Sequence, residues 1–203
     1  LIENGIEEFV VVTGYLRNQI EEFLQNNYAG VNITFIHNDI YDSTNNIYSL
    51  WLTRKEADGK DILLLDSDIL FSPEIVTRLL ASSQENILAL NNHPLGEEEI
   101  KIIVDENGLV KEISKVCSIP DAIGESIGIE RMSSSYTTAL FKELQVMIEE
   151  EKADNVFYEK AFERLIPQGY TFGVMDVTDL FSVELDTVED FLQAKKLIPQ
   201  ELF

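Results

Sequence analysis

The segment that most constrains this fold is residues 61–71, which read DILLLDSDILF. Its run of aliphatic residues predicts a strand that is covered on both faces, as in the centre of a parallel sheet. Asp66 and Asp68 come at the carboxyl end of that strand, which is the edge where open α/β sheets bind ligands. Because side chains at i and i+2 of an extended segment point the same way, the two carboxylates can hold one hard cation. The alternative is that one of them caps the following turn.

Hydrophobic periodicity predicts alternating strands and helices along the rest of the chain. Strands are expected within residues 7–15, 31–38, 61–68, 86–92, 100–114, 125–133, 170–177 and 181–186, with a hairpin turn at Asn107-Gly108 in the fifth. Helices are expected at residues 17–26, after Thr44, from Pro73 to Leu80, at 135–151, at 156–166 and after Thr187. Helical spacing predicts buried faces made of Phe157, Ala161 and Phe162, and of Val188, Phe191 and Leu192. The pattern indicates one α/β domain over residues 1–203, Rossmann-like, with a mostly parallel sheet sandwiched by helices.

The formal net charge of −22 argues against nucleic-acid binding, which requires a basic surface. It does not exclude small phosphorylated substrates, since a divalent cation can bridge carboxylates to phosphate oxygens. Cys117 is the single cysteine, so an internal disulfide is excluded and a cytoplasmic protein is expected. No apolar run reaches membrane-spanning length, and His37 and His93 are too isolated to indicate a histidine metal site.

A third carboxylate, Asp186, also comes at the end of a predicted strand and directly before a helix. It can stabilise the start of that helix electrostatically. Together with Asp68 it also provides a strand-end aspartate in each half of the sheet, which is the arrangement that a Mg²⁺ site needs.

Five segments come in the order seen in the sugar-phosphate nucleotidylyltransferase superfamily: GIEEFVVVTGYL, NNIYSLWL, LLLDSDILF, IIVDENGLVKEISK and ELDTVEDF. The chain most resembles the bacterial CTP:phosphocholine cytidylyltransferases and the related aminoethylphosphonate cytidylyltransferases. This resemblance implies the nucleotide-diphosphosugar-transferase type of fold. It also implies transfer of a cytidylyl group from CTP to a small phosphorylated acceptor, foremost phosphocholine, which gives CDP-choline and pyrophosphate with Mg²⁺ as the cofactor.

The resemblance implies a metal and nucleotide site built from five residues. Asp68 and Asp186 match the aspartates that hold Mg²⁺, and Asp68 is thereby also catalytic. Asp66, Asn46 and Ser49 match residues that line the nucleotide pocket. The alternative for Asn46 is that it only opens a helix.

Lys115, in the segment EISKV, matches the family's catalytic lysine, which neutralises the acceptor's phosphate. Val116 follows it where the family has a proline. For the acceptor's cationic end, aromatic and carboxylate side chains of the C-terminal half are the candidates. Tyr158, Glu159 and Glu125 are therefore the expected acceptor-binding residues.

The family's glycine-rich loop, which binds the triphosphate through backbone N–H groups, has no match here. We therefore expect an N-terminally incomplete domain that lacks its first βα unit, and no catalysis if the protein begins at Leu1. The alternatives are a sugar-1-phosphate or aminoethylphosphonate nucleotidylyltransferase, a glycosyltransferase that uses its D-x-D segment, and a catalytically inactive regulatory domain. The expected partners are CTP and the acceptor, without nucleic acid or membrane, and a homo-oligomer is compatible with the sequence.

Overall fold

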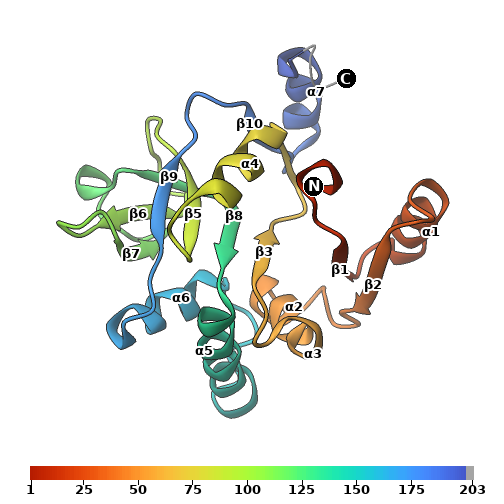
Figure 1. Cartoon of the computed structure of the whole chain (residues 1–203), viewed down its shortest axis with the longest axis horizontal. Coiled ribbons are helices and arrows are strands. Elements are labelled where there is room, and N and C mark those ends of the chain that lie inside the picture. The colour runs from red at the N-terminus through yellow and green to blue at the C-terminus, as the bar shows by residue number, and fades with distance from the viewer. Residues whose placement is uncertain (200–203) are drawn as a thin grey trace.

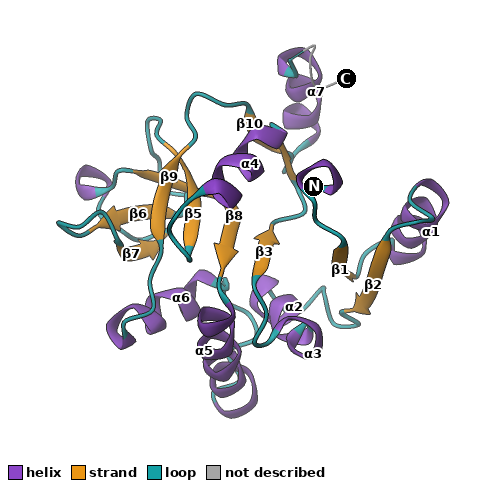
Figure 2. Cartoon of the chain, in the orientation of Figure 1, coloured by secondary structure: helices purple, strands orange, loops and turns teal. Residues whose placement is uncertain are grey.

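The computed structural model describes residues 1–199, so the last four residues of the predicted domain lie outside the described part. Six strands form the main sheet in the order β7-β6-β8-β5-β9, with β3 paired to β8 (Figures 1 and 2). These strands are β3 (Ile62–Leu65), β5 (Ile87–Asn91), β6 (Lys101–Val104), β7 (Val110–Ser114), β8 (Gly124–Met132) and β9 (Gly173–Asp176). The hairpin between β6 and β7 turns at Gly108, whose positive φ of 76° suits glycine, as predicted.

The strand directions follow from the pairings. β5 is parallel to β9, and β3, β5 and β6 are each antiparallel to β8. Four strands (β3, β5, β6 and β9) therefore run one way, whereas β7 and β8 run the other. The predicted α/β fold with a sheet of mostly one direction is confirmed, although β8 separates β3 from β5.

Two short sheets complete the strands. β1 (Glu8–Thr13) pairs in parallel with β2 (Asn32–His37). β4 (Ile69–Phe71) pairs antiparallel with β10 (Ser182–Glu184). The second pairing matters for function, because it brings the end of β10 beside the loop that follows β3.

Helices lie on both faces of the main sheet (Figure 2). They are α1 (Arg17–Asn27), α2 (Asn46–Leu52), α3 (Arg54–Ala57), α4 (Pro73–Ala81), α5 (Ser134–Gln145), a π-helical turn (Val146–Glu150), α6 (Glu159–Leu165) and α7 (Val188–Leu197). Short 3₁₀ turns are Ile2–Asn4, Ile119–Asp121 and Ile166–Gln168. Within residues 1–199, no helix has the length and apolar character needed to cross a membrane.

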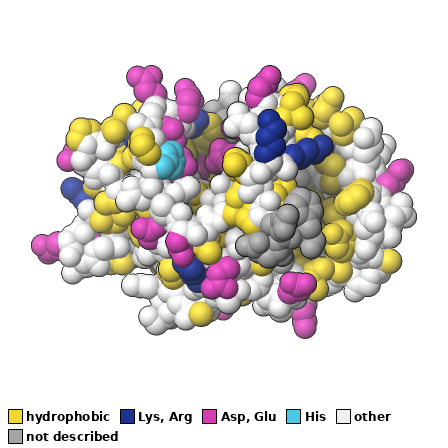
Figure 3. Space-filling model, turned by 90° about the horizontal axis from the view of Figure 1, so that it is seen from above, with side chains coloured by type: hydrophobic (Ala, Val, Ile, Leu, Met, Phe, Trp, Pro, Cys, Tyr) yellow, Lys and Arg dark blue, Asp and Glu magenta, His cyan; other side chains and the backbone are white. Residues whose placement is uncertain are grey.

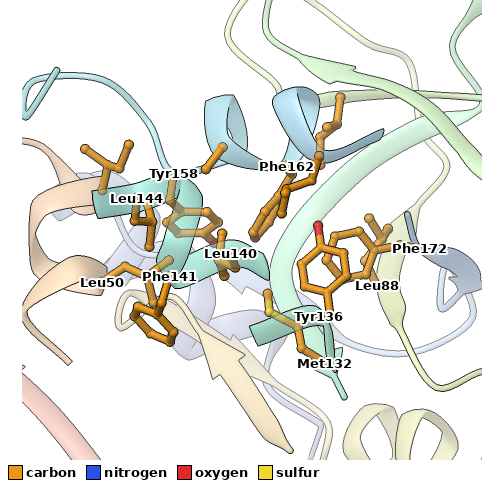
Figure 4. Close-up of a cluster of buried hydrophobic side chains, with 14 of the residues drawn as sticks. Leu50, Leu88, Met132, Tyr136, Leu140, Phe141, Leu144, Tyr158, Phe162 and Phe172 are labelled. Atoms are coloured by element: carbon orange, nitrogen blue, oxygen red, sulfur yellow. The ribbon is translucent and has the colours of Figure 1, made fainter. Parts of the chain in front are cut away.

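The sheet separates two hydrophobic cores. Alternate residues of β5 enter each one, because side chains along a strand point to opposite faces: Leu88 to one core and Ala89 to the other. The larger core contains Tyr136 of α5 and Phe162 of α6, which pack around Phe172 (Figure 4). The smaller core lies under α4. Both faces of the central strands are thus covered by apolar side chains.

Three expectations about burial were wrong. Each residue of β3 is only half-buried, and within the described chain β3 pairs with β8 alone, so it is not a fully covered central strand. Phe157 is 42% exposed rather than in the core. The predicted inner face of α7 is exposed as well, at 70% for Val188, 48% for Phe191 and 52% for Leu192. Helical spacing predicts an apolar face, but only packing partners bury it.

The region of β1, β2 and α1 is also loosely covered. Val10 is 39% exposed, and on α1 Ile20 and Phe23 are 41% and 60% exposed. Figure 3 shows apolar side chains gathered on that side of the molecule. The tightly packed part of the fold is therefore the main sheet with α2, α4, α5 and α6.

Candidate functional site

Asp68 and Asp186 come together at one edge of the structure. Asp68 lies in the turn between β3 and β4, and its carbonyl oxygen accepts the N–H of Leu185 at 2.9 Å. Ile69 pairs with Glu184 in the adjoining ladder, so the chain after β10 runs beside the chain before β4. Both aspartates are exposed at this edge. The two predicted metal ligands are thus brought together by a backbone contact between segments far apart in the sequence.

The residues at this edge suit a hard cation that arrives with phosphate oxygens. No three His, Cys, Asp or Glu side chains of the described residues converge to hold a metal ion by themselves. Mg²⁺ is commonly bound through one or two carboxylates, with substrate phosphates and water completing its shell. Negative charge is crowded here: burial raises the pKa of Glu184 to about 7, and the carboxylates of Glu125, Asp186, Asp68 and Asp66 add to the rise. A bound cation would relieve that repulsion.

Asp66 points inward from the end of β3. Its N–H donates to the carbonyl oxygen of Gly128 at 2.9 Å, and its Oδ1 accepts the hydroxyl of Tyr158 at 3.1 Å. Burial raises the pKa of Asp66 to about 6; the Tyr158 hydrogen bond opposes the rise and the charge of Asp68 adds to it. Gly128 has φ of 68°, and a Cβ there would collide with Oδ2 of Asp66. The position therefore requires glycine.

Glu130 is a buried carboxyl that the sequence analysis did not single out. It is 0% exposed, and Ser126 donates its hydroxyl to Oε1 at 3.1 Å. Oε2 is buried and has no hydrogen-bond partner among the described residues. Burial, and then the charges of Asp66 and Glu159, raise the pKa of Glu130 well above its usual value. The alternation of side chains along β8 indicates that Glu130 is buried, because Glu130 shares a strand face with the buried Met132.

Tyr158 and Glu159 lie inside the protein at the start of α6. Tyr158 is 2% exposed, and its N–H donates to Oδ1 of Asn46 at 2.9 Å. Glu159 is 6% exposed, and burial raises its pKa to about 7; the charge of Asp66 adds to the rise, whereas Lys115 opposes it. Its Oε2 has no hydrogen-bond partner within residues 1–199. Asp66, Glu130 and Glu159 thus form what we call the acid cluster.

Lys115 lies at the edge of the acid cluster. It follows β7, and its Nζ is 3.3 Å from Oε2 of Glu98 and 4.7 Å from the ring centroid of Phe157. Phe157, whose ring is exposed, directly precedes Tyr158 and Glu159 in the chain. Its contact with Lys115 therefore places Lys115 beside the beginning of α6. Two predicted parts of the acceptor site, its anion-binding lysine and its cation-binding residues, are therefore neighbours.

The predicted nucleotide-binding residues Asn46 and Ser49 lie on α2 and take part in internal hydrogen bonds. Asn46 accepts from the backbone of Tyr158, and Oγ of Ser49 accepts from Nδ2 of Asn38 at 3.2 Å. Asn38 is 3% exposed and also lines an open hollow of about 450 Å³ between the ends of β1 and β2 and the start of α1. Neither of these hydrogen bonds involves Asp186, and the nucleotide-binding role of Asn46 and Ser49 stays a prediction.

Glu125, on β8, contacts His93. Its Oε1 is 2.6 Å from Nε2 of His93, and this contact raises the pKa of His93. After burial, the charge of Glu125 is the largest influence on the pKa of Glu184. Of the three predicted acceptor-binding residues, Glu125 therefore belongs to the edge with Asp68 and Asp186.

The chain is similar to known nucleotidyl-transferring proteins. It is 26% identical over 199 residues to the CMP-5'-(3-aminopropyl)phosphonate synthase of Streptomyces rubellomurinus, a match that covers 94% of this chain and 31% of that protein. It is 36% identical over 67 residues to the choline-phosphate cytidylyltransferase of Streptococcus pneumoniae, which covers 33% of this chain and 28% of that protein. Each matched segment thus spans less than a third of the length of the curated relative.

A solved structure has the same fold. The CTP:phosphocholine cytidylyltransferase of Streptococcus pneumoniae superposes with a TM-score of 0.79 at 19% identity, over 98% of this chain and 82% of that one. The chain therefore has the Rossmann-like α/β fold of this solved nucleotidyl-transferring protein. The chain belongs to the family described as "Domain of unknown function (DUF6564)", whose model matches residues 2–115.

Proposed function

We propose that the protein transfers a cytidylyl group from CTP to a small acceptor that carries a phosphate or phosphonate, with release of pyrophosphate. The observation that carries the proposal is the hydrogen bond from the N–H of Leu185 to the carbonyl of Asp68, because it holds Asp68 and Asp186 at one edge. The similarity to a CMP-phosphonate synthase and to a choline-phosphate cytidylyltransferase supports the same reaction type.

Each group has a distinct task in this reaction. Asp68 and Asp186 would hold Mg²⁺, which supplies charge neutralisation on the nucleotide phosphates. Lys115 binds the acceptor's oxyanion and orients it towards the α-phosphorus of CTP. That oxyanion is already ionised at neutral pH, so the reaction requires positioning and charge neutralisation rather than a general base.

The acid cluster supports an acceptor with a cationic end. Phosphocholine is the candidate that the family resemblance favours, and a trimethylammonium head is normally bound by open aromatic faces. Here the Phe157 ring already has Lys115 over it, and Oε2 of Glu159 is a hydrogen-bond acceptor without a donor within the described chain. A primary ammonium can donate to such an oxygen, whereas trimethylammonium cannot. These contacts favour an aminoalkyl phosphonate or phosphate as the second candidate acceptor.

The reaction is tested by pyrophosphate release from CTP with the full-length protein. Phosphocholine, phosphoethanolamine, aminoethylphosphonate and glucose-1-phosphate are compared by kcat/KM. We expect the cationic acceptors to be used in preference to the hexose phosphate. Preference for glucose-1-phosphate would favour the sugar-1-phosphate alternative, and no transfer to any acceptor would favour a regulatory domain.

The role of Lys115 is tested by Lys115→Met. We expect the acceptor's KM to rise at least about tenfold, as for loss of a charge-assisted contact, while the KM for CTP stays unchanged. Lys111→Met is the matched control, because Lys111 lies on β7, the strand that Lys115 follows, and its side chain is 61% exposed beside Glu112. Unchanged acceptor kinetics in Lys115→Met would remove Lys115 from the site.

A further inference from the structure

Lys101, the first residue of β6, is a lysine with an unusual environment. It is 1% exposed, and its Nζ donates to three backbone carbonyl oxygens: Glu97 at 3.1 Å, Glu99 at 3.1 Å and Lys115 at 2.7 Å. An ammonium group has three N–H donors, so each one has an acceptor. A buried charge without such partners would be strongly unfavourable. The ammonium is therefore satisfied by backbone dipoles of two separate segments.

These two segments flank the candidate site. In the sheet, Lys101 pairs with Ser114 on β7 and with Glu125 on β8, so it lies where β7 ends and β8 begins. Lys115 follows Ser114 directly, and Glu98 lies between the two other carbonyl partners of Lys101. The ammonium of Lys101 thus joins the backbone that carries Lys115 to the loop that carries its ion-pair partner Glu98.

The side chain of Lys115 depends on this junction. Its Nζ reaches Oε2 of Glu98 at 3.3 Å and lies 4.7 Å from the ring centroid of Phe157. Lys115 directly follows Ser114, the last residue of β7 that pairs with β6, so the β6–β7 ladder fixes the backbone only before Lys115 and not after it. The 2.7 Å hydrogen bond from Nζ of Lys101 to the carbonyl oxygen of Lys115 fixes the backbone at this point.

We propose that Lys101 is a positioning residue that holds Lys115 in place to receive the acceptor's anionic group. Lys101 does not touch the acceptor, since it is buried. It acts by fixing the main chain at Lys115 and the loop from Glu97 to Glu99. This inference rests on the proposed cytidylyl transfer.

The test is Lys101→Met in the full-length protein, with acceptor and CTP kinetics measured separately. Methionine keeps most of the apolar stem but cannot donate to the carbonyls. We expect the acceptor's KM to rise about tenfold, as for a misplaced binding group, with the KM for CTP within about twofold of wild type. A merely structural lysine would lower the melting temperature and the active fraction but leave the acceptor's KM unchanged.

A double-mutant cycle gives the second readout. If Lys101 acts through Lys115, the variant carrying both Lys101→Met and Lys115→Met should have the same acceptor KM as Lys115→Met alone. The proposal would be overturned if the acceptor KM of the double variant rose by the product of the two single-variant increases. A normal acceptor KM in Lys101→Met would also overturn it. Lys111→Met is the control for loss of a positive charge on the neighbouring strand.

The test must also distinguish a variant that does not fold from a failure of the proposed reaction. If Lys101→Met does not fold, Lys101→Gln carries the test, because glutamine is one bond shorter and has only two N–H donors for the three carbonyls. A raised acceptor KM supports the proposal and a normal one overturns it. Absence of transfer by the wild-type protein would overturn the proposed function together with this inference. Active wild type with a normal acceptor KM in the folded Lys101 variant would overturn the inference alone.

Discussion

Glu159→Gln is expected to make the protein more stable and a poorer binder of its acceptor. Glu159 is 6% exposed, its pKa is raised to about 7 by burial, and its Oε2 has no hydrogen-bond partner in the described residues. Its ionised form is therefore unfavourable in the folded state. Binding sites frequently retain such groups at the expense of stability.

The sign and size follow from the pKa. Because the folded pKa of about 7 lies above the usual 4.5, the folded state binds more protons than the unfolded state between these values. The free energy of unfolding therefore falls as the pH rises from 4.5 to 7 and is constant above that window. A shift of this size corresponds to about 3 kcal/mol at pH 8, and about half as much at pH 5.5. Glutamine does not ionise, so the variant escapes this loss.

The assay is urea unfolding followed by circular dichroism at pH 5.5 and pH 8. The gain in Glu159→Gln should grow between these pH values and raise the melting temperature at pH 8 by roughly 6–12 °C. Glu163→Gln is the matched control on α6: Glu163 forms a surface ion pair with Lys160 at 2.6 Å, so its loss should change stability by less than about 1 kcal/mol. The acceptor's KM should rise in Glu159→Gln alone. Lower stability of Glu159→Gln than of wild type at pH 8, or a gain that does not depend on pH, would contradict a burial-raised pKa of Glu159.

Three further substitutions test the strand-end carboxylates. Gly128→Ala should destabilise the fold by about 2 kcal/mol and lower activity, since a Cβ at this left-handed position meets Asp66; Gly30→Ala, whose new methyl group would have no atom within 4 Å, is the control for melting temperature. Asp68→Ala and Asp186→Ala should each abolish Mg²⁺-dependent pyrophosphate release without loss of the circular dichroism spectrum, because both side chains are exposed. Normal turnover in both aspartate variants would refute their assignment.

Structural features that depend only on residues close together in the sequence were predictable. The helix predicted after Thr187 is α7, which opens with a capping box between Thr187 and Asp190, and Pro73 opens α4 as predicted. The turn at Gly108 likewise follows from the Asn-Gly pair. Each of these needs only a few consecutive residues, so distant packing does not alter it. The cap of α2 differs by one residue, since Asn45 rather than Thr44 accepts the first N–H.

By itself, the sequence determined the α/β fold class, the strand-end location of Asp68 and Asp186, and the position of Lys115 after a hairpin. The tertiary structure decided which of these residues meet and which charges are buried. Glu130 became a buried carboxyl because its strand face is covered by α5 and α6, whereas Phe157 and the apolar face of α7 stayed exposed. The physical reason is that burial and charge coupling depend on distances between segments far apart in the chain, and these distances exist only after the strands have paired.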